Sequence, residues 1–380
     1  MNREKILEIF TKNNLLLDPK ALEFFIQNSS QVESFLEKVK KLERQPVIIT
    51  LDFVKSLEKS YEIEEIKKDG AKKTTLSIED LSNFLVERYE KIKSFFSYRL
   101  DVVNLISINK INEKTKKFSL IVMVREIDRE NKIAFVEDLT GEISVRVLND
   151  LIDFLVQDEV VGLFCEKKDE EIQVTNVFWP DIPLKRTIGK LEEDILCLFV
   201  SEVAFEENYE EILKEISKLN FKFLFIFLFL NKILEEKLKV FKEKIPPNSK
   251  LVLISNAKQN FDDILCFSSP AFLVLDKKIV FLLVDGKIFS NYKNLGKDCV
   301  EIMLNLLKKR HLNPIFKIEN LSLEDRYLVD PIPDIFVSAN FGNSSLINYK
   351  GTTIISCGSS EKLFWIVNLK SRENLKISLT

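Results

Sequence analysis

A chain of 380 residues is long enough for two or three domains, each with a core of its own. Apolar residues make up 46% of the sequence and charged residues 30%, which excludes wholesale disorder. The formal net charge of −3 gives no overall attraction for nucleic acid, so any such contact needs a local basic patch. Only 9 glycines accompany 30 phenylalanines, and the absence of a P-loop or a GxGxxG motif excludes the usual glycine-rich phosphate sites.

The five cysteines are dispersed and odd in number, without the close pairs of a zinc site or a disulfide framework. We expect them to be reduced residues in the cores of a cytoplasmic protein. The first five residues lead into an amphipathic pattern and not into the apolar region of a signal peptide, so we expect no secretion.

Residues 1–58 predict a small helical domain, because apolar side chains recur in them at helical spacing. Asp18 is expected as the N-cap before Pro19, and Ser30 with Glu33 as a capping box. Such a domain usually serves packing or docking, and a specific interaction role is the alternative. Residues 59–76 are charged and poor in apolar side chains, which is typical of a linker.

Ser77 with Asp80 predicts a capped helix from residue 78 to about residue 98. Short β patterns follow at residues 102–108, 118–124, 133–136, 143–148, 160–164 and 172–177. About five strands with one helical segment near residues 150–154 fit an OB-fold barrel, so residues 77–188 are predicted to be a helix plus an OB-fold domain. Residues 137–141 predict a tight turn in which Gly141 takes a positive φ.

An OB barrel suggests binding of single-stranded nucleic acid, which needs aromatic platforms beside a basic groove. The barrel could supply positive charge from Lys116, Lys117, Arg125, Arg129, Lys132 and Arg146. Its aromatic residues Phe118, Phe135 and Phe164 lie within strongly apolar runs, so we expect them in the core. The pattern therefore favours protein contact over direct contact with DNA.

Residues 189–380 predict a third domain, in which apolar strands covered on both faces alternate with helices. Strands are expected at residues 196–200, 223–230, 251–254, 272–275, 279–284, 334–337, 353–356 and 363–367. The apolar run at 223–230 is far shorter than the roughly 20 residues that span a membrane, so it predicts a buried strand. A helix after Asn208 should cover it. A second helix at 300–311 carries Lys308, Lys309 and Arg310 near its C-terminus, where cations suit the helix dipole.

Three motifs occur in this framework: residues 306–314 (LLKKRHLNP), residues 333–336 (PDIF), and residues 137–141 (EDLTG) ahead of 179–183 (WPDIP). With them, the chain resembles the small, B-type subunits of archaeal family D DNA polymerases. The resemblance implies a multidomain α+β protein whose third domain has a calcineurin-like metallophosphoesterase fold, a two-sheet α/β sandwich. It further implies a large catalytic subunit as partner in a heterodimer or larger complex. DNA would be reached mainly through that complex, with no membrane contact, in the cytoplasm at the nucleoid.

Members of this family that keep an active site carry carboxylates, an Asn and several imidazoles at strand ends, because two cations about 4 Å apart must clamp the reacting oxygens. The resemblance implies that the corresponding positions are degenerate in this chain: Glu202, Ala204, Asn256, Ala257, Lys258, Asp285, Asn340 and Gly342. His311 is the only histidine, and it lies in the 306–314 motif. We therefore expect no catalytic, metal or cofactor-binding residues.

Other interpretations stay open at this stage. Glu202, Asp262, Asp263 and Asp285 could hold one Mg²⁺, although Lys258 among them would repel it. The resemblance favours an inactivated phosphoesterase that acts as a scaffold and has lost 3′–5′ exonuclease activity. A divergent phosphodiesterase or nuclease, and a free-standing single-stranded DNA-binding protein, are the alternatives.

Overall fold

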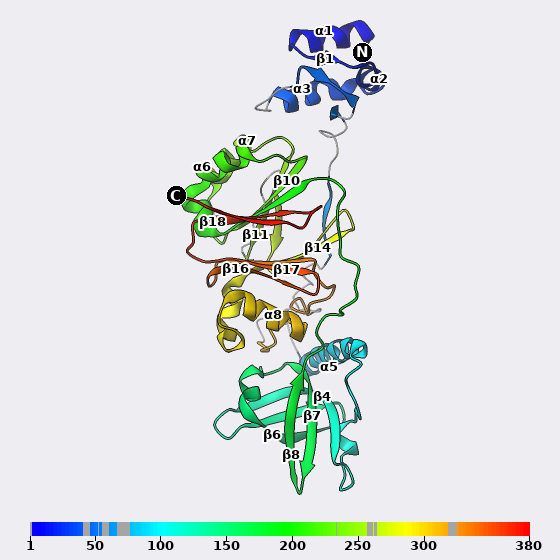
Figure 1. The fold of residues 1–380 in the computed structure, drawn as a ribbon, viewed down its shortest axis with the longest axis vertical. Coiled ribbons are helices and arrows are strands. Elements are labelled where there is room, and N and C mark those ends of the chain that lie inside the picture. Colours follow the sequence, from blue (N-terminus) through cyan, green and yellow to red (C-terminus); the bar gives the residue numbers. More distant parts are fainter. Residues whose placement is uncertain are drawn as a thin grey trace.

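The structure is a computed structural model, and it describes residues 2–40, 46–51, 53–54, 61–66, 77–232, 234–256, 261, 264–317 and 325–380. Along its long axis, a helical part, a two-sheet sandwich and a barrel follow one another, with helix α5 (Ile78–Phe95) beside the barrel (Figure 1). Within the described ranges, no helix is long and apolar enough to cross a membrane.

The N-terminal part consists of α1 (Arg3–Lys12), α2 (Pro19–Gln27) and α3 (Val32–Lys40), with β1 (Leu16–Leu17) and β2 (Ile48–Ile49) paired in parallel. Phe10, Phe25 and Phe35 form its aromatic core. The predicted cap of α2 is confirmed, because Asp18 Oδ1 accepts a hydrogen bond from Ala21 N at 2.6 Å. The predicted capping box at Ser30 is wrong. Ser30 lies inside a 3-10 turn (Ser29–Gln31) that runs directly into α3, so it lacks the extended conformation of an N-cap.

Part of the predicted linker is a strand of the sandwich. Residues 61–66 are described, and β3 (Ile63–Glu65) pairs antiparallel with β13 (Ala271–Leu275). Tyr61 is buried in the core between the two sheets, and its hydroxyl donates to Glu193. The linker prediction was wrong for this stretch. Tyr61 and Ile63 are apolar residues that pack in the sandwich, but most of their neighbours in the sequence are charged, which is the pattern of a linker.

Helix α5 has the predicted capping box, in which Ser77 and Asp80 exchange two hydrogen bonds of 3.1 Å. Five strands then close a barrel in the order β4-β5-β6-β8-β7. They are β4 (Lys117–Asp128), β5 (Ile133–Asp138), β6 (Gly141–Val147), β7 (Val160–Lys168) and β8 (Glu171–Phe178). A 3-10 segment (Asn149–Phe154) joins β6 to β7 at the place where a helical segment was predicted.

Two details of the barrel differ from the predictions. Residues 102–107 form a loop with an isolated bridge from Leu105 to Ser119, and residue 108 starts a 3-10 turn (Ile108–Lys110), so the predicted strand at 102–108 is wrong. Gly141 starts β6 without a positive φ, because Asp138 shapes the turn instead: its Oδ1 accepts from Thr140 N at 2.7 Å.

The sandwich stacks two six-stranded sheets. One has the order β12-β11-β10-β9-β18-β19, with β9 (Ile195–Val200), β10 (Phe223–Phe229), β11 (Ser249–Ser255), β12 (Leu265–Ser268), β18 (Leu363–Asn368) and β19 (Asn374–Ser378). The other has the order β16-β17-β15-β14-β13-β3, with β14 (Ile279–Asp285), β15 (Ile335–Ala339), β16 (Ser344–Tyr349) and β17 (Thr352–Cys357). The sequence did not predict β12, β16 or β19.

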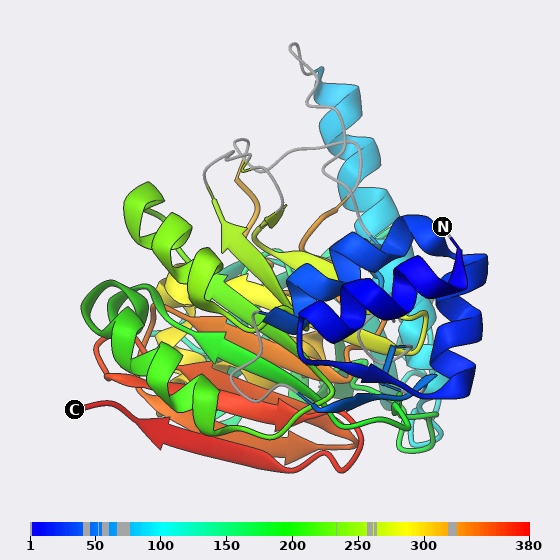
Figure 2. The ribbon, with the colours of Figure 1, turned by 90° about the horizontal axis from the view of Figure 1, so that it is seen from above.

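Helices cover the outer faces of both sheets, so the sandwich has four layers (Figures 1 and 2). Helices α6 (Glu202–Lys218) and α7 (Glu235–Lys244) pack on the first sheet, and α8 (Cys299–Lys309) with a 3-10 segment (Gly286–Leu295) packs on the second. The rings of Phe199, Phe227 and Phe281 meet between the sheets. The predicted burial of the 223–230 run is confirmed. All five cysteines are free, and only Cys266 is partly exposed.

Candidate functional site

Five polar side chains come from the carboxyl ends of five strands and meet at one edge of the sandwich. Glu202 follows β9, Asn231 follows β10, Asn256 follows β11, Asp285 ends β14 and Asn340 follows β15. Strands β9, β10 and β11 are mutually parallel, as are β14 and β15, so their carboxyl ends gather at a shared edge. We call these five residues the strand-end cluster.

Asp285 is the centre of the strand-end cluster and is almost fully buried. Its Oδ2 atom accepts hydrogen bonds from the side-chain amides of Asn231 at 2.9 Å and Asn256 at 2.8 Å. Its backbone N–H donates to Ser269 Oγ at 2.7 Å. The carboxylate that faces the cluster is thus already held by two amide groups.

Asn340 and Glu202 close the other side of the cluster. Asn340 stands at a φ of 66° directly after β15. Its Oδ1 accepts from Glu202 N at 3.0 Å, and its Nδ2 donates to Phe229 O at 3.3 Å. Glu202 Oε2 in turn accepts from Asn231 N at 3.1 Å. One asparagine therefore ties together the ends of three strands.

The structure brings together four of the predicted degenerate positions: Glu202, Asn256, Asp285 and Asn340. Ala204 lies buried in the first turn of α6, and Gly342 takes a φ of 62° against Cys299. Ala257, Lys258, Asp262 and Asp263 lie outside the described residues.

Sequence reasoning missed Asn231, because the search after the second strand was for acidic residues. Asparagine has nearly the same shape as aspartate, so an asparagine after the second strand was the sequence signal that could have identified this residue.

The donor set of the strand-end cluster does not fit a two-metal centre. Two carboxylates and three amides converge, whereas such a centre needs several imidazoles and carboxylates as ligands. The single histidine of the sequence is bound elsewhere, to Asp325. In the described part of the chain, no group of three or more His, Cys, Asp or Glu residues could hold a metal ion.

The 306–314 motif lies away from this cluster, where the sandwich meets the barrel. Lys309 Nζ contacts Glu159 Oε2 at 2.6 Å and donates to Phe154 O at 2.8 Å, and its ammonium lies 4.2 Å from the ring centre of Trp179. The side chains of Lys309 and Glu159 are 2% and 1% exposed. Burial lowers the pKa of Lys309, and the contact with Glu159 opposes that shift. Lys309 lies in the last turn of α8 as predicted, and its ammonium is in addition a buried ion-pair partner, which was not predicted.

Arg310 and His311 extend this contact to α5. Arg310 ends α8 in the left-handed conformation, with its guanidinium 4.0 Å from the ring centre of Phe95. Burial lowers the pKa of Arg310 to about 10. His311 Nδ1 accepts from Asn313 N at 3.1 Å, so the hydrogen on Nε2 faces Asp325 Oδ2 at 2.9 Å.

Asp325 also binds α5 directly, because its Oδ2 atom lies 2.6 Å from Arg88 Nε. Burial alone would raise the pKa of Asp325, but His311 and Arg88 outweigh it and hold the pKa well below the usual range. We call the set Arg88, Phe95, Glu159, Trp179, Lys309, Arg310, His311 and Asp325 the interdomain junction.

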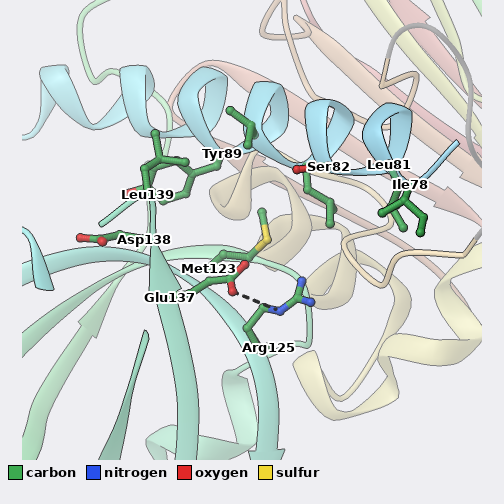
Figure 3. Close-up of a pocket in the computed structure, with 11 residues that line it drawn as sticks. Ile78, Leu81, Ser82, Tyr89, Met123, Arg125, Glu137, Asp138 and Leu139 are labelled. Carbon is green, nitrogen blue, oxygen red and sulfur yellow. Dashed lines mark ion pairs between the residues drawn. The ribbon is translucent and has the colours of Figure 1, made fainter. Parts of the chain in front are cut away.

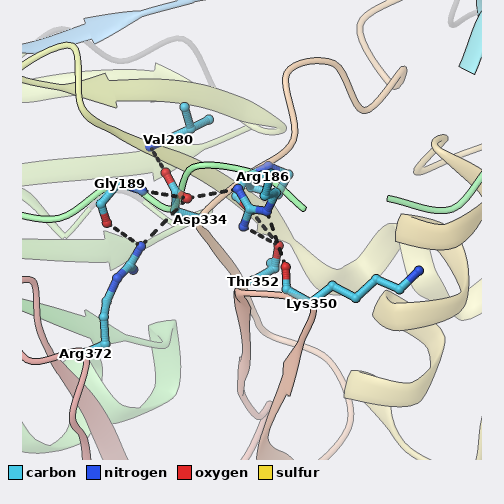
Figure 4. A network of polar contacts seen from close by, with 8 residues as sticks. Arg186, Gly189, Val280, Asp334, Lys350, Thr352 and Arg372 are labelled. Atoms are coloured by element: carbon cyan, nitrogen blue, oxygen red, sulfur yellow. Dashed lines mark hydrogen bonds and ion pairs between the residues drawn. The ribbon is translucent and has the colours of Figure 1, made fainter. Parts of the chain in front are cut away.

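The PDIF motif fixes the segment that connects the barrel to the sandwich (Figure 4). Asp334 Oδ1 accepts from Arg186 Nη1 at 3.0 Å and from Gly189 N at 3.2 Å, and its Oδ2 accepts from Val280 N at 3.0 Å. A side chain at residue 189 would meet Lys278 O at 1.9 Å, so only glycine fits there. Asp181, from the WPDIP motif, accepts from Tyr349 and Lys350 of the sandwich.

The six predicted nucleic-acid contacts do not form a free basic groove. Four of them face carboxylates: Lys117 pairs with Glu166, Arg125 with Glu137, Arg129 with Asp153 and Arg146 with Glu171. Lys116 and Lys132 are exposed. Four of the six cations are thus paired within the barrel, and their contact with nucleic acid stays a prediction.

The aromatic residues of the barrel also differ from a stacking platform. Phe118 is buried as predicted, and Phe164 packs on Phe178 with ring centres 4.4 Å apart. Phe135 is 44% exposed, so its prediction as a core residue was wrong: it points outward from β5, between Glu126 and Ser144. The strands around it carry the carboxylates of Glu126, Asp128, Glu137 and Glu142. Carboxylates beside the ring would repel a phosphate backbone.

No protein-family model matches the chain. The DNA polymerase II small subunit of Thermoplasma acidophilum is 21% identical over 433 residues, which cover 94% of this chain and 86% of that protein. The resemblance to polymerase small subunits is confirmed. The DNA polymerase II small subunit of Methanothermobacter thermautotrophicus is 30% identical over 139 residues, or 34% of this chain and 28% of that protein.

A solved structure, described as a novel archaeal phosphodiesterase, is 10% identical with a TM-score of 0.33. That match covers 48% of this chain and 99% of the phosphodiesterase.

Three of the motifs that pointed to the small subunits have a common position in the molecule, whereas residues 137–141 lie in the β5–β6 hairpin. Residues 306–314, 333–336 and 179–183 all hold the barrel, the connecting segment and the sandwich against one another. These three motifs therefore lie at contacts between domains and not in the strand-end cluster.

Proposed function

We propose that this chain is a non-catalytic accessory subunit of a family D DNA polymerase, which binds and stabilises the large catalytic subunit. The observation that carries the proposal is the strand-end cluster, where two asparagine amides donate to the buried carboxylate of Asp285. Among the described residues, these amide donors hold that carboxylate in place of a cation. The names of the related small subunits support the polymerase assignment.

We infer that the barrel is an OB fold and the sandwich a calcineurin-like phosphoesterase fold. Support for the first is the strand order β4-β5-β6-β8-β7, with β6 and β8 parallel and a 3-10 segment after β6. Support for the second is the convergence of strand ends at the edge where Glu202 and Asp285 lie. The proposed domains are residues 1–58, 77–188 and 189–380, with β3 from the intervening segment added to the third.

The scaffold role is supported by the interdomain junction, where the buried pairs Lys309–Glu159 and Arg88–Asp325 join its two sides. Loss of one partner would leave the other charge buried without its counterion, at a cost of about 3–5 kcal/mol. The barrel and the sandwich would then present one rigid surface to the large subunit. DNA would be reached mainly through the complex, because the outer face of β4, β5 and β6 is rich in carboxylates.

The test of the non-catalytic claim is a nuclease assay on the purified full chain. We expect no 3′–5′ degradation of end-labelled single-stranded DNA with Mn²⁺ or Mg²⁺. A divergent nuclease would instead show activity that co-elutes with the chain and disappears in a Glu202→Ala, Asp285→Ala variant. The matched control is Glu206→Ala, which alters an acidic residue of the same helix whose carboxylate pairs with Lys232 at 3.4 Å.

A further inference from the structure

The apolar stripe of α5 extends beyond the surface that the barrel covers. In the C-terminal half, Tyr89, Ile92 and Phe95 are buried against the barrel, and Tyr89 Oη donates to Ile121 O at 2.8 Å. In the N-terminal half, Ile78 is 88% exposed and Val86 is 37% exposed. A helix that is apolar where nothing covers it has an unused contact face.

Phe84 of this half is buried beside Phe316, but the exposed side of the half, with Ile78 and Val86, forms one wall of a groove (Figure 3). The opposite wall is the end of the β5–β6 hairpin with Leu139, which is 55% exposed, and Met123 lies at the floor. We define the α5 groove by Ile78, Leu81, Ser82, Leu85, Val86, Tyr89, Met123, Arg125, Glu137, Asp138 and Leu139. Its volume of about 280 Å³ is at the lower limit of the roughly 300–1,000 Å³ of small-molecule sites, and it has room for a few side chains of a protein partner.

Charge at the rim of the α5 groove is acidic. Glu137 and Asp138 line it, and the guanidinium of Arg125 lies 3.5 Å from Glu137 and 4.0 Å from Asp158. Glu79, next to Ile78 in the first turn of α5, is not among the lining residues but adds an exposed carboxylate at that end of the helix. A partner segment that complements this rim carries basic side chains next to its apolar ones.

We propose that the α5 groove docks a segment of the large polymerase subunit in which two or three aliphatic side chains are flanked by lysine or arginine. This proposal rests on the proposed function as an accessory subunit. The aliphatic side chains fill the space between α5 and Leu139, and their burial supplies the affinity. The basic side chains meet Glu137 and Glu79, which orients the segment and speeds its association.

The first test removes the apolar wall. Leu139→Ser in the full chain should weaken binding of the purified large subunit about tenfold, measured by calorimetric titration. The matched control is Leu375→Ser, because Leu375 is 53% exposed and lies on β19, away from the groove. This control should bind within about twofold of the unmodified chain. Thermal melting verifies that both variants stay folded.

The second test reverses the rim charge. Glu137→Lys should lower the association rate with the large subunit, and the loss should shrink as salt rises. Glu130→Lys makes the same charge change in the β4–β5 hairpin, at the opposite end of β5, and should leave the rate unchanged.

The outcomes separate the two proposals. If the unmodified chain binds the large subunit and Leu139→Ser binds equally well, the groove proposal is overturned and the accessory role stands. If the unmodified chain does not bind the large subunit at all, the accessory role itself fails. If the chain alone self-associates in sedimentation and Leu139→Ser abolishes that, the groove is a contact between copies, and the proposal is overturned as well.

Discussion

Replacement of Lys309 by methionine should strongly destabilise the contact between the barrel and the sandwich. Lys309 and Glu159 lie 2.6 Å apart with side chains 2% and 1% exposed, so neither charge can be solvated by water. Without Lys309, the carboxylate of Glu159 stays buried without a cation. The expected loss is about 3–5 kcal/mol of the unfolding free energy of this junction.

A double variant separates the charge from the loss of packing. Glu159 accepts hydrogen bonds from Val156 N at 2.9 Å and from Trp179 Nε1 at 3.2 Å. Glutamine can keep an acceptor there while the charge is removed. We therefore expect Lys309→Met with Glu159→Gln to cost no more than about 2 kcal/mol, less than Lys309→Met alone.

The assay is urea unfolding followed by the fluorescence of Trp179, whose ring lies 4.2 Å from the ammonium of Lys309. The sequence has two tryptophans, and a Trp365→Phe background leaves Trp179 as the only reporter. Lys218→Met is the control, because it removes an exposed pair with Glu215 and should have no measurable effect. If Lys309→Met unfolds like this control, or if the double variant is as unstable as the two single changes added together, the account of the junction is refuted.

Three further predictions concern acid stability, the sheet edge and metal content. The pKa of Asp325 is held below its usual range in the folded protein, so its contribution is fully present above the unfolded pKa of about 3.9 and is lost as pH falls through the folded pKa. Asp325→Asn should therefore be less stable at pH 7 but lose less stability below about pH 4 than the unmodified chain; equal slopes in acid-unfolding curves would contradict this. Tyr61→Ala should cost about 3 kcal/mol in urea unfolding, because it empties a buried aromatic site beside Phe223. No loss would mean that residues 61–66 are dispensable for the sandwich. Elemental analysis of the full chain should find no stoichiometric Mn, Fe or Zn, because the donor set lacks imidazoles, and one or two equivalents per chain would contradict the scaffold proposal.

Much of the framework could be predicted because local signals decide it. The caps at Asp18 and Ser77 depend on residues within three positions, and the apolar run of β10 requires burial on both faces. The resemblance to the small subunits implied that Glu202, Asn256, Asp285 and Asn340 follow strand ends at related places, and the structure brings these four residues together. The sequence did not reveal which hydrogen bonds they make, since these join segments up to 138 residues apart.

The features that were not predicted depend on partners that are distant in the chain. The burial of Lys309 requires Glu159, 150 residues earlier, and that of Arg310 requires Phe95 of α5. Cationic side chains at a helix end are usually exposed to solvent, and the sequence alone does not reveal the distant partners that bury them here. β3 was not predicted for the same reason, because its partner strand β13 lies more than 200 residues later in the chain. Phe135 was misassigned because an apolar run does not specify which of two alternating faces is outside.

The central claim is that this chain forms a stable complex with a large polymerase subunit, and light scattering after co-expression and size exclusion tests it most directly. The account predicts one species whose mass is the sum of the two chains or a multiple of that sum. If the barrel and the sandwich supply the interface, residues 59–380, which retain β3, should give the same result. Two separate peaks, each with the mass of one chain at moderate salt, would contradict the account.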